Sequence, residues 1–297
     1  MLWAFVLVML FSTAHAFAAD LKPETIQAWN EYVKSAAVRN QRHLVSGSSF
    51  LSSDEVPGRT ARLRRGEIIV SPAGPHVPLP VPSGLIHDWV GAAFVPNVTF
   101  DDILPVLRNY EHYKDFYHPN VIDSKLIATG DSGDRFSMIL MNKSAIAKTA
   151  LDSDYQSSYI RLDAHRQYSI TEATRMQEIA EYGTPLQHTI PENKGTGLIW
   201  RLYSFTRFEE RDGGVYIELE ALALSRDIPG SLRWLVEPVV RRISRSSLAT
   251  SLQQTGEAVR PGTKSISRSS DRPPCPSGKK CTLATAALGL NPDRSGR

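Results

Sequence analysis

The sequence predicts an α+β domain in which a run of antiparallel strands is followed by one long C-terminal helix. Three observations support this fold class. A strand is followed by two short helical segments, several alternating strand patterns then come one after another, and residues 230–255 carry an apolar repeat of helical period. Strands that are grouped along the chain, rather than alternating with helices, favour α+β over a parallel α/β sheet.

Residues 1–19 have the pattern of a signal peptide. An apolar run over residues 2–11 is too short to span a bilayer, and Ala14-His15-Ala16 offers a small-x-small cleavage site, with a second choice after Ala19. Because no Lys or Arg precedes the run, a buried N-terminal helix is the alternative. We expect an exported protein, periplasmic or secreted, whose mature chain has no transmembrane segment.

Composition argues against a disordered chain and against nucleic-acid binding. Hydrophobic residues make up 41% of the sequence, as in a globular protein, and the net charge is only +3. The basic residues gather at 59–65, 241–245 and 264–297 without interleaved aromatic residues. They therefore indicate solvated surface rather than a nucleic-acid interface.

Residues 20–84 precede the main fold. Ile26, Trp29 and Val33 recur at helical spacing and predict a short amphipathic helix. The rest of this segment is rich in Ser, Pro, Gly and Arg. Its only strand pattern lies before a Pro-rich stretch that predicts an extended arm; these are residues 66–70 and 72–82.

The core elements lie within residues 85–255 and begin with a β-rich stretch over 85–95. Thr99 can cap a helix that Pro105 keeps short, and a second short helix ends before His118-Pro119. Strand patterns follow at 121–129, 135–143, 146–155, 159–179, 197–209 and 215–224.

The last two strands form the clearest hairpin, with a tight turn at Asp212-Gly213. Alternation places one set of side chains on an inner face: Trp200, Leu202, Ser204, Thr206 and Phe208, with Ile217 and Leu219 on the partner strand. The opposite set is expected on a solvated outer face, with opposite charges paired across the strands: Arg201, Arg207, Glu218 and Glu220.

A long helix follows the hairpin. Its apolar residues recur at helical spacing and predict a face against the sheet, kinked at Pro238 and ending near Gly256. These residues are Leu232, Leu235, Val239, Ile243 and Leu248.

Residues 256–297 contain few large apolar groups, which predicts a disordered basic tail. Cys275 and Cys281 lie in this tail and either form a small disulfide loop or stay as thiols. No metal site is expected there, because no further ligands stand at zinc spacing.

Two segments of the core carry motifs of a known superfamily. The first reads Val-Leu-Arg-Asn-Tyr-Glu-His-Tyr over 106–113 and Phe-Tyr-His-Pro-Asn-Val over 116–121; the second spans 203–229. They are similar to START-like (SRPBCC) proteins, the polyketide cyclases and coenzyme-Q-binding START domains, although Asn109 stands where the family usually has Asp. The resemblance covers residues 85–255. It implies a helix-grip fold, an antiparallel sheet of about seven strands wrapped around the long C-terminal helix, with a cavity between them.

We therefore expect a protein that binds or transports a hydrophobic small molecule or lipid in that cavity, without a cofactor or a metal. A sheet and helix that both turn apolar faces inward can exclude water from such a ligand. The expected lining residues are Trp200, Leu202, Phe208, Ile217, Leu219, Trp234, Leu235 and Val239.

Two alternatives remain open from the sequence. A cyclase- or hydrolase-like enzyme would need convergent titratable groups, for which Arg161, His165 and Glu172 are the candidates. Arg161 and His165 alternate along one strand and are the possible polar groups of the cavity, although a solvated strand face is the simpler interpretation. His87 and Asp88 are adjacent on a strand, so they face opposite ways and cannot share a substrate. We assign no catalytic residue. A non-catalytic scaffold with a collapsed cavity is the other alternative, and it predicts no pocket above roughly 300 Å³.

Overall fold

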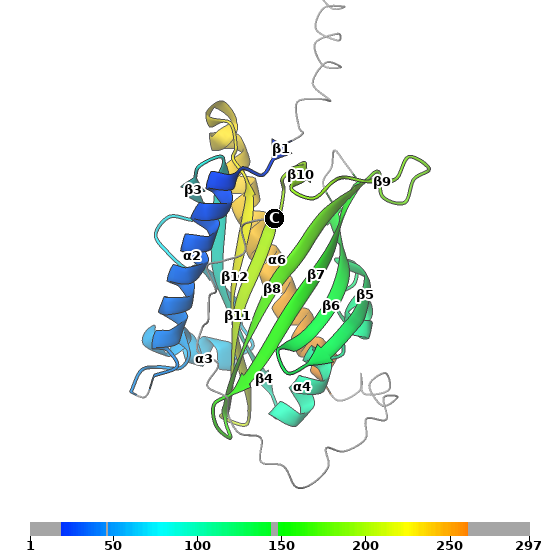
Figure 1. The fold of residues 1–297 in the computed structure, drawn as a ribbon. Helices are drawn as coiled ribbons and strands as arrows, with labels where there is room; N and C mark the ends of the chain where they lie inside the picture. Colours follow the sequence, from blue (N-terminus) through cyan, green and yellow to red (C-terminus); the bar gives the residue numbers. More distant parts are fainter. Residues whose placement is uncertain (1–18, 46, 144–147, 261–297) are drawn as a thin grey trace, which may run out of the picture.

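Figure 1 shows a computed structural model of the chain, which describes residues 19–45, 47–143 and 148–260. The signal-peptide pattern up to residue 18, Cys275, Cys281 and the tail from residue 261 lie outside these residues. The predicted cleavage and the choice between a disulfide and thiols therefore stay predictions.

One antiparallel sheet of ten strands dominates the described chain, in the order β2-β4-β12-β11-β8-β7-β6-β5, with β3 also paired to β4 and β9 to β8. Its strands are β2 (Ile69–Pro72), β3 (Leu79–Val81), β4 (Gly84–Pro96), β5 (Val121–Gly130), β6 (Gly133–Lys143), β7 (Lys148–Arg161), β8 (Arg166–Ala180), β9 (His188–Thr189), β11 (Arg201–Arg211) and β12 (Gly214–Arg226). A separate pair joins β1 (Ala19–Asp20) to β10 (Lys194–Gly195).

The predicted fold class, α+β with an antiparallel sheet and a long C-terminal helix, is confirmed. The sheet has ten strands rather than about seven. The difference arises because β2 and β3, which lie in the segment predicted to be mostly an extended arm, pair with β4, and because β9 pairs with β8.

Two helices lie on opposite faces of the sheet (Figure 1). On one face, called the α2 face, α2 (Pro23–Arg42) places Trp29 in a buried cluster with Ile86. On the other, called the α6 face, α6 (Gly230–Val259) buries Leu252 against the sheet. The shorter helices are η1 (Ser52–Glu55), α3 (Arg59–Arg64), α4 (Phe100–Leu107), η2 (Tyr110–His112) and α5 (Tyr113–Phe116).

The C-terminal half of α6 packs tightly on the sheet. It crosses β4 at Gly91, where a Cβ atom would stand 2.7 Å from Leu252 Cδ1 and 2.9 Å from Leu248 Cγ. Glycine at this position therefore allows the close approach of helix and strand. α6 continues to Val259 rather than ending near Gly256.

The first half of α6 is turned away from the predicted orientation. Leu235 and Val239 are 55% and 54% exposed, and Trp234 is 77% exposed. The predicted stripe fails between Ile243 and Leu248, because a step of five residues turns about 140° around a helix. Since Leu248 is buried against the sheet, the line through Leu235, Val239 and Ile243 lies on the outer side of the helix.

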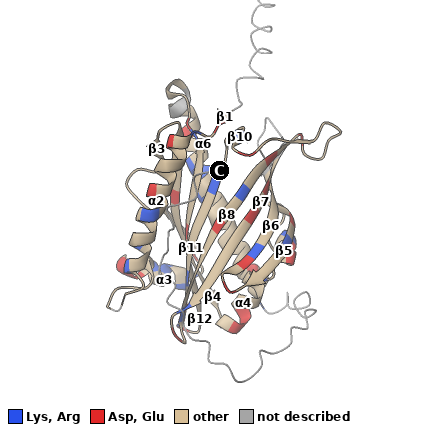
Figure 2. Cartoon of the chain, in the orientation of Figure 1, with Lys and Arg blue, Asp and Glu red and all other residues tan. Residues whose placement is uncertain are grey.

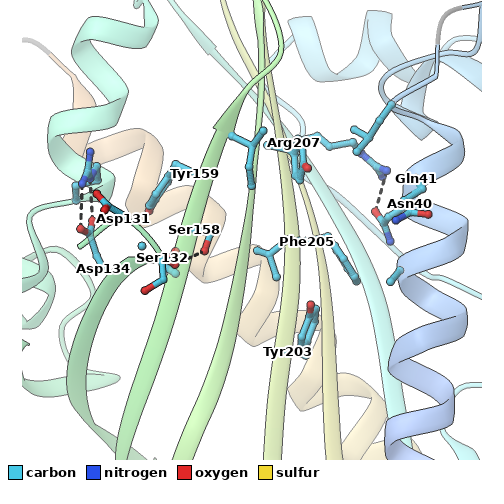
Figure 3. Close-up of a pocket in the computed structure, with 18 of the residues that line it drawn as sticks. Asn40, Gln41, Asp131, Ser132, Asp134, Ser158, Tyr159, Tyr203, Phe205 and Arg207 are labelled. Atoms are coloured by element: carbon cyan, nitrogen blue, oxygen red, sulfur yellow. Dashed lines mark hydrogen bonds and ion pairs between the residues drawn. The ribbon is translucent and has the colours of Figure 1, made fainter. Parts of the chain in front are cut away.

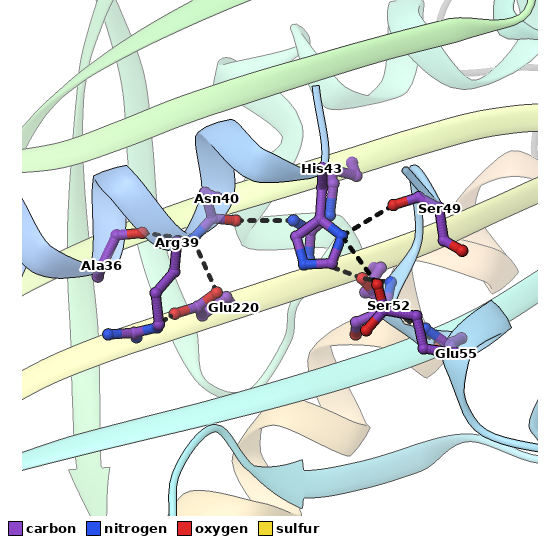
Figure 4. Close-up of polar contacts among 11 residues, drawn as sticks. Ala36, Arg39, Asn40, His43, Ser49, Ser52, Glu55 and Glu220 are labelled. Carbon is purple, nitrogen blue, oxygen red and sulfur yellow. Dashed lines mark hydrogen bonds and ion pairs between the residues drawn. The ribbon is translucent and has the colours of Figure 1, made fainter. Parts of the chain in front are cut away.

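The charged outer face of the hairpin is buried, contrary to the sequence prediction. α2 and the segment after it cover this face, so Arg207, Glu218 and Glu220 are only 4%, 1% and 5% exposed. Figure 4 shows Arg39 and Asn40 of α2 reaching Glu220, at 2.9 Å and 2.8 Å from its carboxylate oxygens. Elsewhere acidic and basic residues are interspersed over the strands in the view of Figure 2.

Candidate functional site

The strand register defines a continuous row of side chains across the middle of the α6 face. Trp89 on β4 stands opposite Ala221 on β12, which stands opposite Ser204 on β11. Ser204 in turn faces Thr171 on β8, and Thr171 faces Ser157 on β7. The two last hydroxyls are 2.8 Å apart, which places them on the same side of the sheet.

This middle part of the α6 face is accessible although α6 crosses the same face. The side chains of two central strands, β11 and β12, remain partly exposed there. We call them the open part of the α6 face: Leu202, Ser204, Thr206, Leu219 and Ala221. Nearer α4 the same face is filled, because Phe208 and Ile217 are buried in one cluster with Leu252.

Buried polar atoms without hydrogen-bond partners border the open part. On β4 they are His87 Nδ1 and Trp89 Nε1, and on β7 they are Ser153 Oγ and Tyr155 Oη. A buried polar atom left without a partner costs about 1–3 kcal/mol, a cost that a ligand or a water would remove. β4, which pairs with β12, and β7, which β8 separates from β11, therefore each present unsatisfied hydrogen-bonding groups.

Both titratable groups in this set are neutral near pH 7. Burial lowers the pKa of His87 to about 4, against a smaller opposing effect of Glu237, and its Nε2 lies 2.9 Å from the Ser225 hydroxyl. Burial also raises the pKa of Tyr155 above its ordinary value. The polar atoms that border the open part are therefore suited to uncharged hydrogen-bonding groups.

A second candidate is a groove of about 620 Å³ on the α2 face (Figure 3). Its floor is aromatic and aliphatic: Tyr168, Ile170, Tyr203 and Phe205 of β8 and β11. One wall is the C-terminal half of α2 and the other is the turn between β5 and β6; both walls are lined by polar residues, including Asn40, Gln41, Asp131 and Ser132.

The polar groups of this groove largely satisfy one another. Asn40 Nδ2 donates to Glu220 at 2.8 Å, and Asn40 Oδ1 accepts from Arg207 at 2.9 Å. The Ser158 hydroxyl donates to the Ser132 carbonyl at 2.9 Å. Arg207 Nε has no partner, but it is buried below the groove surface. The groove thus offers an apolar floor but few unsatisfied groups that a ligand could reach.

The residues predicted to line one cavity do not lie together in the structure. Leu202 and Leu219 lie in the open part of the α6 face, whereas Phe208 and Ile217 are buried at its filled end. Trp200 belongs to the buried cluster beneath α2. It precedes β11, so strand alternation does not extend to it. Three further predicted residues are exposed on α6: Trp234, Leu235 and Val239.

The predicted polar groups do not converge. Arg161 donates to the carbonyls of Asp163 and Ala164, and His165 is exposed in the same turn between β7 and β8. Glu172 is exposed, opposite Tyr203, on the α2 face.

The pair His87–Asp88 is divided by the sheet, as alternation predicts. His87 contacts Ser225, whereas Asp88 accepts from Tyr32 and Arg39 of α2. Neither the pair His87–Asp88 nor the group of Arg161, His165 and Glu172 therefore places two titratable side chains around one point.

Sequence reasoning did not identify the partnerless polar groups. A signal was nevertheless present, because Ser153, Tyr155, Ser157 and Tyr159 carry a hydroxyl at every second position of one strand. Such a pattern places all four on one face. Within the described residues no group of three or more His, Cys, Asp or Glu side chains is placed to hold a metal ion. No helix in that part of the chain combines the length and apolar character needed to cross a bilayer.

Comparison with known proteins yields likenesses of structure alone. No family model matches the chain, and no curated protein matches it. A STAR-related lipid transfer protein fragment from Xanthomonas axonopodis is 16% identical with a TM-score of 0.44, over 65% of this chain and 99% of that one. Human STARD10 is 13% identical with a TM-score of 0.39, over 68% and 77%. An aromatase/cyclase of a Streptomyces species is 16% identical with a TM-score of 0.38, over 59% and 96%.

Proposed function

We propose that this protein binds a hydrophobic small molecule or lipid against the open part of the α6 face. The observation that carries the proposal is the combination found there. Central strands keep apolar side chains partly exposed, and buried polar atoms without partners lie on β4 to one side and on β7, beyond β8, to the other. Ligand sites in proteins have this composition, a mainly apolar surface with a few polar groups that fix orientation.

The chemistry of the border indicates which ligands fit. Leu202, Leu219 and Ala221 would contact an apolar body, and the hydroxyl of Tyr155 or the ring nitrogen of His87 would bond one or two polar groups. Because both residues are neutral near pH 7, the ligand's polar groups are uncharged, such as a hydroxyl or a carbonyl. A free carboxylate would have no cation beside it among these residues and would be costly to bury.

Catalysis gains no support from the candidate titratable groups. General acid–base chemistry requires the groups to lie within hydrogen-bond reach of the same reacting atoms. Arg161 and His165 lie at an exposed turn, and Glu172 lies on the other face of the sheet. Binding or transport therefore remains the function that the geometry supports best.

Adjacent residues of β11 provide a matched test, because they belong to opposite faces. Ser204→Trp would fill the open part of the α6 face, whereas Tyr203→Ala would only enlarge the groove on the α2 face. The probe is N-phenyl-1-naphthylamine, a neutral apolar fluorophore, titrated into the full chain. We expect saturable binding with a dissociation constant on the order of 1 µM, weakened about tenfold or more by Ser204→Trp and unchanged by Tyr203→Ala.

Thermal melts of both variants establish that each is folded before affinities are compared. The opposite pattern, with loss of binding only in Tyr203→Ala, would move the site to the groove. An absence of saturable binding in folded wild-type protein would contradict the proposal.

A further inference from the structure

The first half of α6 carries an apolar line that no described residue covers. Trp234, Leu235, Val239 and Ile243 are 77%, 55%, 54% and 58% exposed. Leu235, Val239 and Ile243 follow one another at intervals of four residues, so they lie along one side of the helix. Trp234 stands about 100° around the helix from Leu235 and therefore borders this line. The opposite side of α6 is the one that packs on β4, through Leu248 and Leu252 further along.

Basic side chains flank this line. Residues 230–245 contain four arginines and one glutamate. Arg241 pairs with that glutamate, Glu237, at 2.7 Å. Arg242 and Arg245 are exposed and form no ion pair with any described residue. Arg242 stands three residues after Val239, which makes the two neighbours on the helix surface.

We propose that this half of α6 docks on an anionic lipid surface. Helices that lie in the membrane interface combine an apolar side containing Trp and Leu with Arg or Lys on the flanks. Trp234 would sit at the headgroup level, where indole rings are favoured. Leu235, Val239 and Ile243 would enter the acyl boundary, and Arg242 and Arg245 would meet anionic headgroups.

The charge distribution favours a lipid surface over a second copy of this chain. Pairing two such helix faces would bring the arginines of both copies together with only one glutamate on each side, and like charges oppose such a contact. An anionic bilayer neutralises the arginines and covers the apolar line at once. Membrane docking is a second function beside the proposed ligand binding, which uses the sheet face on the inner side of the same helix. The two can be tested separately.

Vesicle sedimentation of the full chain tests the proposal. Phosphatidylcholine vesicles are compared with vesicles that also contain phosphatidylglycerol, at low and high salt. We expect binding to the anionic vesicles that weakens as salt rises. The double variant Leu235→Ser with Val239→Ser should lose affinity about tenfold or more. Arg242→Gln with Arg245→Gln should lose a similar factor, since each arginine contributes roughly fivefold.

The charge-matched control is Arg64→Gln with Arg65→Gln, which removes two exposed arginines at the end of helix α3, away from the first half of α6. This variant should bind the vesicles as the wild type does. A blue shift of tryptophan emission on binding, absent in Trp234→Phe, would place the indole in the interface. Binding of N-phenyl-1-naphthylamine without vesicles should be the same in all these variants, which separates this proposal from the ligand site.

Membrane docking would be contradicted if the wild-type chain did not bind anionic vesicles, or if Arg64→Gln with Arg65→Gln lost as much vesicle affinity as Arg242→Gln with Arg245→Gln. It would also be contradicted if the chain self-associated and Leu235→Ser with Val239→Ser abolished that self-association, because the apolar line would then bind a second copy.

Discussion

Arg207 Nη2 lies 2.7 Å from Glu218 Oε1 in the centre of the sheet, with both side chains buried beneath the segment that follows α2. Glu218 also accepts hydrogen bonds from the backbone of Ser52 and from the backbone and hydroxyl of Ser53. Burial acts to raise the pKa of Glu218, but Arg207 and the serine donors outweigh it and lower the pKa below its ordinary value. Glu218 thus ties the N-terminal segment to the sheet, and Arg207 balances its buried charge.

Replacing Arg207 with Ala should destabilise the protein strongly, because Glu218 would stay buried without its cation. Breaking one side of a buried pair costs about 3–5 kcal/mol. The control is Arg62→Ala, which breaks an exposed pair with Glu67 and should cost no more than about 1 kcal/mol. Urea unfolding measures both. Equal small losses would show that the pair is not buried in solution.

Asp88 and His87 should give the protein opposing responses to pH. Burial and the neighbouring Glu220 raise the pKa of Asp88 to about 7, against the effects of Tyr32 and Arg39. The folded state therefore holds a proton that the unfolded state releases near pH 4, so this stabilisation is lost as pH rises through about 7. His87, lowered to about 4, is neutral when folded, so it removes stability as pH falls below about 6.5.

Between about pH 4.5 and 6.5 the two effects act in opposite directions. Asp88→Asn removes the stabilisation that Asp88 provides on acidification and leaves the loss caused by His87. The variant should therefore lose stability from pH 6.5 to 4.5 more steeply than the wild type does. It should also lack the wild-type decline between about pH 6.5 and 7, where Asp88 still titrates and His87 no longer does. Melting temperatures across this range provide the measurement, and parallel profiles for wild type and variant would refute the assignment.

Tyr155 and Tyr110 pack on the same ring, that of Phe136, but only one of their hydroxyls has a partner. Tyr110 donates to Asp134 at 3.0 Å, whereas the Tyr155 hydroxyl has only the Ser153 hydroxyl beside it, outside good hydrogen-bond geometry. Tyr155→Phe should leave stability unchanged or raise it by about 1 kcal/mol, while Tyr110→Phe should lower it by about 1.5–3 kcal/mol. Calorimetry of both variants distinguishes these outcomes. A destabilised Tyr155→Phe would mean that its hydroxyl is already bonded in the free protein.

The orientation of α6 can be tested by two of its leucines. Leu252 is 3% exposed, so Leu252→Ala should cost about 2–5 kcal/mol. Leu235 is 55% exposed, and Leu235→Ser should change stability by about 0.5 kcal/mol or less. Chemical unfolding of the two variants gives the comparison. If Leu235→Ser is the more damaging, the helix faces the sheet as the apolar spacing alone predicts.

Local signals were sufficient for much of the fold. Thr99 starts α4 with its hydroxyl and backbone N–H both donated to Asp102, and Asp212 and Gly213 take the positive φ angles that a tight hairpin turn requires. The face shared by Leu202 and Phe208 also follows from alternation, which depends only on the strand itself.

What covers a face could not be predicted in the same way. Alternation places Arg207 and Glu218 on one side of the hairpin, but only the docking of α2 decides whether water reaches them. Similarly, α6 carries apolar residues on two opposite sides, and the contact of Leu248 and Leu252 with Gly91 decides which side faces the sheet. Both outcomes depend on tertiary packing between segments that are far apart in the sequence.

Photolabelling with a long-chain alcohol that carries a diazirine in its chain tests the proposed site most directly. The full chain is irradiated with the probe, with and without excess unlabelled alcohol, and labelled residues are identified by tandem mass spectrometry. The account predicts labelling at Leu202, Thr206 or Leu219 that the unlabelled alcohol suppresses. Labelling confined to Tyr203, Tyr168 or Gln41 in the groove, or labelling that the competitor does not reduce, would contradict it.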